Sequence, residues 1–317
     1  MPDPLLYLKA MIAASIVSAI TMLTMVKLRR SASQTWLNSA AVLAIGLGLT
    51  VGYSVLAFRW IWPPANGLDR FLTLVIPAVL AIELIAGFQQ IPTWTAWVLR
   101  IILAGTIPRI LLHGSVYLNS EMTDSAAWQL GTVLALCVAL AVGLWWLLSW
   151  LSVRSPSISI SMTVSLATQG AGLAIMLSGY IKGGAAAFPL VATVITTTIM
   201  AQLLTWHIRE PTRLVSPTAS LGIGLVSLCS LLLIGCFFGR LSTSSALVIL
   251  LAPLLCWMTE FSPLRQLNPW LAGSIQIALV TIPLLGVLAV EKHQFDREML
   301  PLLSIVRIQD GLPHSRN

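Results

Sequence analysis

The sequence predicts an all-α protein, a polytopic transmembrane helix bundle of about ten spans with no sizeable soluble domain. Two compositional observations favour this class: the mean hydropathy is +0.90 with 57% hydrophobic residues, and only 9% of residues are charged. Soluble domains carry roughly 25% charged residues. The third observation is that the apolar runs are continuous instead of alternating residue by residue, which indicates helices and not barrel strands.

Ten apolar runs are separated by charges, prolines and glycines, and a helical span needs roughly 20 residues. In chain order we expect spans at 5–26, 39–61, 71–88, 95–117, 128–150, 157–181, 186–206, 219–238, 245–261 and 269–290. The run 245–261 is short, so nine spans is the alternative count. Tryptophans near several predicted ends support the boundaries, because the indole ring prefers the headgroup region.

The two ends of the chain complete the predicted domain. The first run is kept as a span because Asp3 precedes it and no small-residue cleavage site follows it. Residues 1–290 then form one transmembrane domain, and 291–317 form a short polar tail. The apolar patch 301–309 is too short to span, so it either lies on the membrane surface or covers the end of the bundle.

Basic residues predict the orientation of the spans. One set of connections contains Lys27, Arg29, Arg30, Arg154, Arg209, Arg213 and Arg265. The opposite set holds Arg59, Arg70, Lys182 and Arg240 together with the acids Asp69, Glu121 and Asp124. The positive-inside rule places the first set in the cytoplasm and both termini outside. This predicts a multi-pass protein of the cell membrane, as in a bacterial inner membrane, although nine spans would place the tail inside.

The remaining composition argues against several classes of partner. The net charge of +7 is spread over loop ends, so we expect no nucleic-acid partner. Four cysteines, Cys137, Cys229, Cys236 and Cys256, fall inside apolar runs without a CxxC pair or a histidine at ligand spacing. They are expected to be small buried hydrophobes, and we expect neither a metal site nor a cofactor.

Ionisable residues in the third and fourth spans are the main functional clue, because hydrocarbon penalises charge by several kcal/mol. Glu83 lies near the inner end of its span, and Arg100 lies at nearly the same depth on the returning helix. The short connection between the spans allows the two side chains to pair. A structural ion pair is the first interpretation, and a gating or substrate-coupled pair is the second.

Arg109 and His113 form a second basic group, four residues apart and beside Pro108. Nine residues separate Arg109 from Arg100, which places the two arginines on roughly opposite faces of the helix. An arginine fork suits carboxylate or phosphate, so Arg109 predicts a site for an anionic solute or lipid headgroup. In the alternative, Arg109 binds carbonyls freed by the proline, or meets Glu121 or Asp124. Polar residues of later spans complete the candidate substrate-binding set: Ser165, Gln169 and Gln202.

These features lead to a hypothesis of function. We expect a permease-like carrier of a small anionic or amphipathic solute, embedded in the lipid bilayer. The alternative is a non-catalytic membrane subunit or scaffold that binds partner subunits. An intramembrane enzyme is less well supported, because the sequence has no phosphate-binding loop, HExxH helix, GxSxG turn or paired acidic motif for magnesium.

Overall fold

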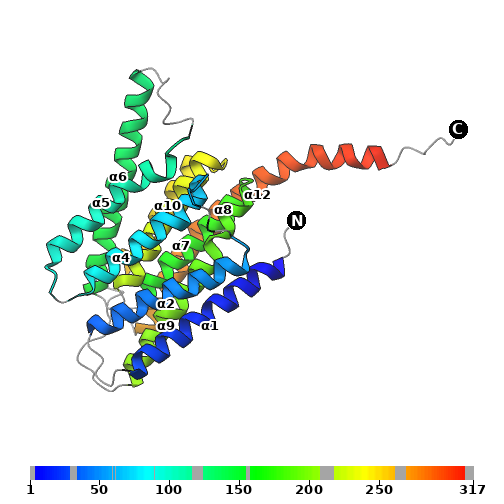
Figure 1. Ribbon diagram of the computed structural model, residues 1–317. Helices are drawn as coiled ribbons and strands as arrows, with labels where there is room; N and C mark the ends of the chain where they lie inside the picture. The colour runs from blue at the N-terminus through cyan, green and yellow to red at the C-terminus, as the bar shows by residue number, and fades with distance from the viewer. Residues whose placement is uncertain are drawn as a thin grey trace.

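The structure is a computed structural model that describes residues 4–28, 34–58, 60, 62–88, 90–115, 124–154, 158–207, 218–260 and 269–310. In these residues the secondary structure is helical and contains no strand, and the helices form a bundle (Figure 1). The predicted all-α fold class, built from membrane-type helices without a soluble domain, is confirmed.

Eight helices of the described chain are long and apolar enough to cross a bilayer. They belong to α1 (Pro4–Leu28), α2 (Gln34–Val55), α5 (Thr93–Leu112), α6 (Asp124–Arg154), α7 (Ile158–Leu177), α8 (Ile181–Ala185) with α9 (Ala187–His207), α10 (Thr218–Phe238), and α12 (Pro269–Asp310). The expected spans at 71–88 and 245–261 are instead built from shorter pieces.

The first composite segment runs through α3 (Gly67–Arg70), the π-helical turn η1 (Phe71–Val75) and α4 (Ile76–Ala86) without a gap. Pro77 stands in the first turn of α4. A proline has no amide hydrogen to donate to the preceding turn, so a wider π turn forms just before it.

The second composite segment joins α11 (Thr243–Leu251) to the 3-10 helix η3 (Ala252–Glu260). Pro253 lies at the junction and removes an α-helical backbone donor there. Nine α-helical residues and nine 3-10 residues span roughly 31 Å, because a 3-10 helix rises about 2.0 Å per residue instead of 1.5 Å. The segment is therefore long enough for a hydrocarbon core of about 30 Å despite its few residues.

Packing contacts give the directions of the central helices. α10 runs parallel to α7, since Gly224 lies next to Val164 and Gly235 next to Ile175. α12 also runs parallel to α7, whereas α4 and α10 are antiparallel. These directions are the ones expected if each successive segment runs opposite to the segment before it.

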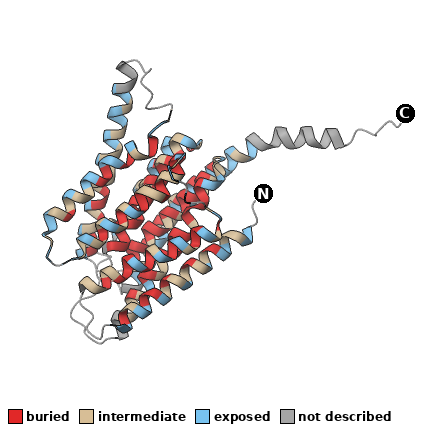
Figure 2. Cartoon of the chain, viewed as in Figure 1, coloured by how far each residue is buried: buried red, intermediate tan, exposed pale blue. Residues whose placement is uncertain are grey.

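α7 and α10 are the most buried of the eight long helices, and α6 is the least buried (Figure 2). Hydroxyl groups connect the core: Ser220 of α10 lies 3.3 Å from Ser161 of α7 and accepts a hydrogen bond from Thr198 of α9 at 3.4 Å. These contacts are interhelical hydrogen bonds of the kind that hold membrane bundles together.

The last helix is longer than the expected tenth span. α12 is one helix of 42 residues that continues past Val290 (Figure 1). Glu291 is still buried, at 2% exposure, while Lys292 and His293 are exposed. The expected boundary at 290 therefore falls inside a continuous helix, and residues 311–317 of the expected tail lie outside the described part of the chain.

Candidate functional site

Glu83 of α4 and Arg100 of α5 form a bidentate ion pair. Arg100 donates from Nε to Oε1 at 2.9 Å and from Nη2 to Oε2 at 2.8 Å. The Glu83 side chain is 2% exposed and that of Arg100 is 11% exposed. Two parallel bonds between planar groups are the strongest geometry for this pair, and they neutralise two charges that the bilayer would otherwise penalise.

Aromatic and small residues surround this ion pair. The guanidinium of Arg100 lies over the rings of Trp97 and Trp145, 5.4 Å and 5.3 Å from their centroids. On the other side Gly222 of α10 contacts the carboxylate so closely that an added Cβ would overlap Oε1 of Glu83. Helices α4, α5, α6 and α10 therefore meet at this ion pair. Sequence patterns indicated the two charged residues but not the surrounding tryptophans and glycine.

Arg109 lies closer to a helix end than the sequence suggested. α5 ends at Leu112, five residues before the expected end of the span, and a turn with Gly114 at φ +66° follows. Arg109 is thus about one turn, or roughly 5 Å, from the end of its helix. A cation in the last turn interacts favourably with the helix dipole, and this depth suits contact with a headgroup.

The side chain of Arg109 is exposed and lines an open groove between α5 and α6. The groove has a volume of about 780 Å³, and its other walls are apolar. Within the described residues, no ion pair or hydrogen bond involves the Arg109 side chain. Glu121 and the Asp124 side chain, the acids considered as its partners, lie outside the part of the chain whose placement is described.

Arg70 binds the carbonyl groups at the end of α5. It donates from Nη1 to the carbonyl oxygens of Leu111 and His113, the first at 3.4 Å and the second closer. The exposed His113 is the residue after the helix, so its side chain lies outside the span. Arg70 therefore caps the last carbonyl groups of α5.

The other candidate residues lie on different helices and do not line the Arg109 groove. Ser165 is buried and donates to the carbonyl oxygen of Ser161 on its own helix. Gln169, also on α7, is partly buried, and its Oε1 has no hydrogen-bond partner among the described residues. Gln202 is partly buried near the end of α9. α5 packs on α3, α4, α6 and α10, and α7 packs on α8, α9, α10 and α12, so the structure does not bring these side chains together with Arg109.

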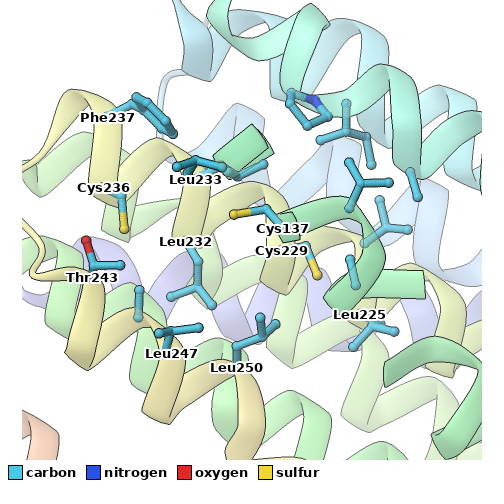
Figure 3. A pocket seen from close by; sticks show the side chains of 18 of the residues that line it. Cys137, Leu225, Cys229, Leu232, Leu233, Cys236, Phe237, Thr243, Leu247 and Leu250 are labelled. Carbon is cyan, nitrogen blue, oxygen red and sulfur yellow. The ribbon is translucent and has the colours of Figure 1, made fainter. Parts of the chain in front are cut away.

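A second space adjoins the groove. It is a pocket of about 230 Å³ between α5, α6, α10 and α11, lined almost entirely by apolar side chains (Figure 3). Pro108 and Val138 line both spaces. Sequence patterns did not indicate this pocket, because its walls are ordinary span residues that differ from their neighbours only in packing.

Three of the four cysteines line that pocket: Cys137, Cys229 and Cys236. The fourth, Cys256, is fully buried and donates to Oγ1 of Thr163 at 3.3 Å. The described residues contain no cluster of three histidine, cysteine or acidic side chains suited to a metal ion.

Comparison with known proteins adds no family: no family model, no curated protein and no solved structure matches the chain.

Proposed function

We propose that this protein is a carrier of small anionic, amphipathic solutes, which it binds at Arg109 from the bilayer side. The observation that supports this is the contrast between the two arginines of α5. Arg100 is neutralised by Glu83, whereas Arg109 lies on an open groove without an acidic partner among the described residues. A guanidinium in that position binds carboxylate, sulfonate or phosphate groups through charge-assisted hydrogen bonds.

The environment of Arg109 favours an amphipathic solute over a fully polar one. Apart from Arg109, the groove is lined by apolar residues. A solute that keeps its charged group at Arg109 would keep its remaining atoms against these apolar walls. Ligand sites of this kind combine a mostly apolar lining with a few polar groups that fix orientation.

We further propose that the protein lies in the cell membrane with ten crossings and both termini outside. The alternating helix directions and the length of the segment formed by α11 and η3 support ten crossings. Arg109 and the groove would then face the outer leaflet.

The test is movement of a labelled alkyl sulfonate in proteoliposomes. Sulfonates stay ionised, so they cross a protein-free bilayer far more slowly than neutral acids do. The sulfonate carries a fluorescent label, which dithionite destroys only in the outer leaflet. Native protein is expected to move labelled sulfonate from the inner leaflet to the outer leaflet, where dithionite destroys the label. Arg109→Gln is expected to slow this movement at least tenfold, whereas Arg154→Gln, at the opposite end of the bundle, is expected to match native protein. Equal rates for native protein and Arg109→Gln would contradict the proposal.

A non-catalytic membrane subunit is the second candidate, and the exposure of α6 favours it. Gly131 and Gly143 of α6, and Gly105 of α5, have open space where a Cβ would be. Small residues on an uncovered face permit close approach of a partner helix. Co-purification of a stoichiometric partner that protects an engineered cysteine at Gly131 from labelling would favour this candidate over the carrier.

A further inference from the structure

The apolar pocket between α5, α6, α10 and α11 opens sideways toward the bilayer. α6 packs against α5 and α10, and α11 packs against α10, but in the described part of the chain α6 and α11 make no extensive contact with each other. Val133 of α6 and Leu247 of α11 both line the pocket, and they are 51% and 40% exposed. The opening therefore lies between these two helices, at a surface that faces lipid.

The lining of the pocket is uncharged. Leucine, valine, alanine and other apolar side chains form most of it, and no charged side chain among the described residues contributes. A charged ligand would lose its hydration here without replacement hydrogen bonds. The pocket therefore suits an uncharged molecule that is already dissolved in the bilayer.

Sulfur atoms give this lining a distinct chemistry. Three of the four cysteines of the chain line the pocket: Cys137 from α6, and Cys229 and Cys236 from α10 (Figure 3). Cys229 and Cys236 are seven residues apart, so they lie on the same face of their helix. Sulfur is polarisable and makes favourable contacts with the edges of aromatic rings.

Aromatic side chains add to this preference. Trp145 of α6 and Phe237 of α10 are part of the lining, and aromatic rings attract one another in offset or edge-to-face arrangements. The pocket volume of about 230 Å³ exceeds the roughly 150 Å³ of an apolar protein cavity that binds benzene. There is therefore room for at least one aromatic ring.

We propose that this pocket is a second binding site, which takes an uncharged lipophilic molecule with an aromatic ring from the bilayer through the opening between α6 and α11. Arg109 lines the groove on the other side of α5 and α6 and does not line the pocket. The inference therefore goes beyond the proposed carrier function and does not depend on it.

Photolabelling with a small uncharged probe tests the site. Phenyl(trifluoromethyl)diazirine is added to the full protein in phosphatidylcholine nanodiscs, and the labelled residues are mapped by mass spectrometry. Butylbenzene is expected to remove the labelling of α10 between Leu225 and Phe237, and to leave labelling at the exposed Leu136 of α6 unchanged. Labelling of α10 that butylbenzene does not remove would show that the pocket holds only bulk lipid chains, and would overturn the proposal.

A saturated competitor tests the preference for an aromatic ring. At equal concentration in the membrane, butylcyclohexane is expected to compete about threefold less well than butylbenzene, because it lacks the contacts between sulfur and the ring. Equal competition by the two compounds would overturn the aromatic assignment.

Substitutions that fill the pocket provide the matched comparison. Ala141→Phe places a ring in the pocket from α6, whereas Leu136→Phe places one on the exposed face of the same helix. Ala141→Phe is expected to reduce the competable labelling at least tenfold, and Leu136→Phe is expected to leave it unchanged. Ala246→Phe fills the pocket from α11 and replaces Ala141→Phe if that variant does not fold. Native levels of competable labelling in a folded pocket variant would contradict the site.

Arg109→Gln shows whether the two sites are separate. This variant is expected to keep the competable labelling of native protein, whatever its effect on sulfonate movement. Loss of the labelling in Arg109→Gln would contradict a pocket that is independent of the groove.

Discussion

Arg70 donates a hydrogen bond to the carbonyl oxygen of His113 at one end of the α4–α5 hairpin, and Glu83 pairs with Arg100 near the other end. Both contacts join matching positions of the two antiparallel segments. Arg70 is thirteen residues before Glu83, and His113 is thirteen residues after Arg100. Two charged contacts thus connect the segments at both ends of the hairpin. The ion pair neutralises charge, and the Arg70 contact caps the final carbonyls of α5.

Removing the Arg70 contact is expected to loosen the end of α5. Arg70→Gln leaves the carbonyls of Leu111 and His113 without the charged donor, at a cost of about 1 kcal/mol for a partly exposed bond. Backbone hydrogen exchange between residues 111 and 115 is expected to become faster. Lys182→Gln is the control at an exposed lysine, and unchanged exchange in Arg70→Gln would contradict the capping role.

Removing the ion pair between Glu83 and Arg100 is expected to destabilise the whole bundle. Glu83→Gln retains the shape of the side chain but leaves Arg100 without its counter-charge, and breaking one partner of a buried pair costs about 3–5 kcal/mol. Unfolding in mixed micelles measures the loss, with Arg154→Gln as the control.

The double variant Glu83→Gln with Arg100→Met separates charge from packing. If the single variant is unstable because of an unpaired charge, the double variant is expected to recover most of the lost stability. A double variant less stable than Glu83→Gln would indicate that packing of Arg100 between Trp97 and Trp145 matters more than its charge.

A methyl group at position 222 is expected to disturb the same ion pair. In Gly222→Ala the new Cβ meets Oε1 of Glu83, and the carboxylate cannot move without breaking its bonds to Arg100. We expect a loss of about 1–3 kcal/mol, as for other overpacked sites. Gly105→Ala is the matched control, because open space surrounds Gly105. Equal stability of the two variants would show that the contact between α10 and Glu83 is looser than described.

Sequence patterns predicted the bundle because a continuous apolar run in lipid must satisfy its own backbone hydrogen bonds, and a helix does so within one segment. Glu83 and Arg100 were predicted to pair because they lie at similar distances from the short connection between their helices. The same comparison of distances would have placed Arg70 beside His113. The pattern failed at the end of α5, because hydropathy continues past Leu112 while the backbone turns at Gly114. It also missed Gly222, Trp145 and the apolar pocket, since these depend on how α6 and α10 pack and leave no mark in composition.

The orientation prediction is tested by labelling in intact cells. In a variant without its native cysteines, Ser115→Cys is expected to react with a membrane-impermeant maleimide, because the connection after α5 is predicted to lie outside. Thr93→Cys, at the first residue of α5, is expected to react only after the membrane is opened. The reverse pattern would place both termini in the cytoplasm.

Charge selectivity of movement shows whether Arg109 selects anionic solutes. Labelled dodecyl sulfonate and labelled dodecyl trimethylammonium have the same chain and permanent charges of opposite sign, so they differ in the group that would meet Arg109. Native protein in proteoliposomes is expected to move the sulfonate at least tenfold faster than the ammonium compound, and Arg109→Gln is expected to remove this difference. Equal movement of the two compounds by native protein would contradict the account.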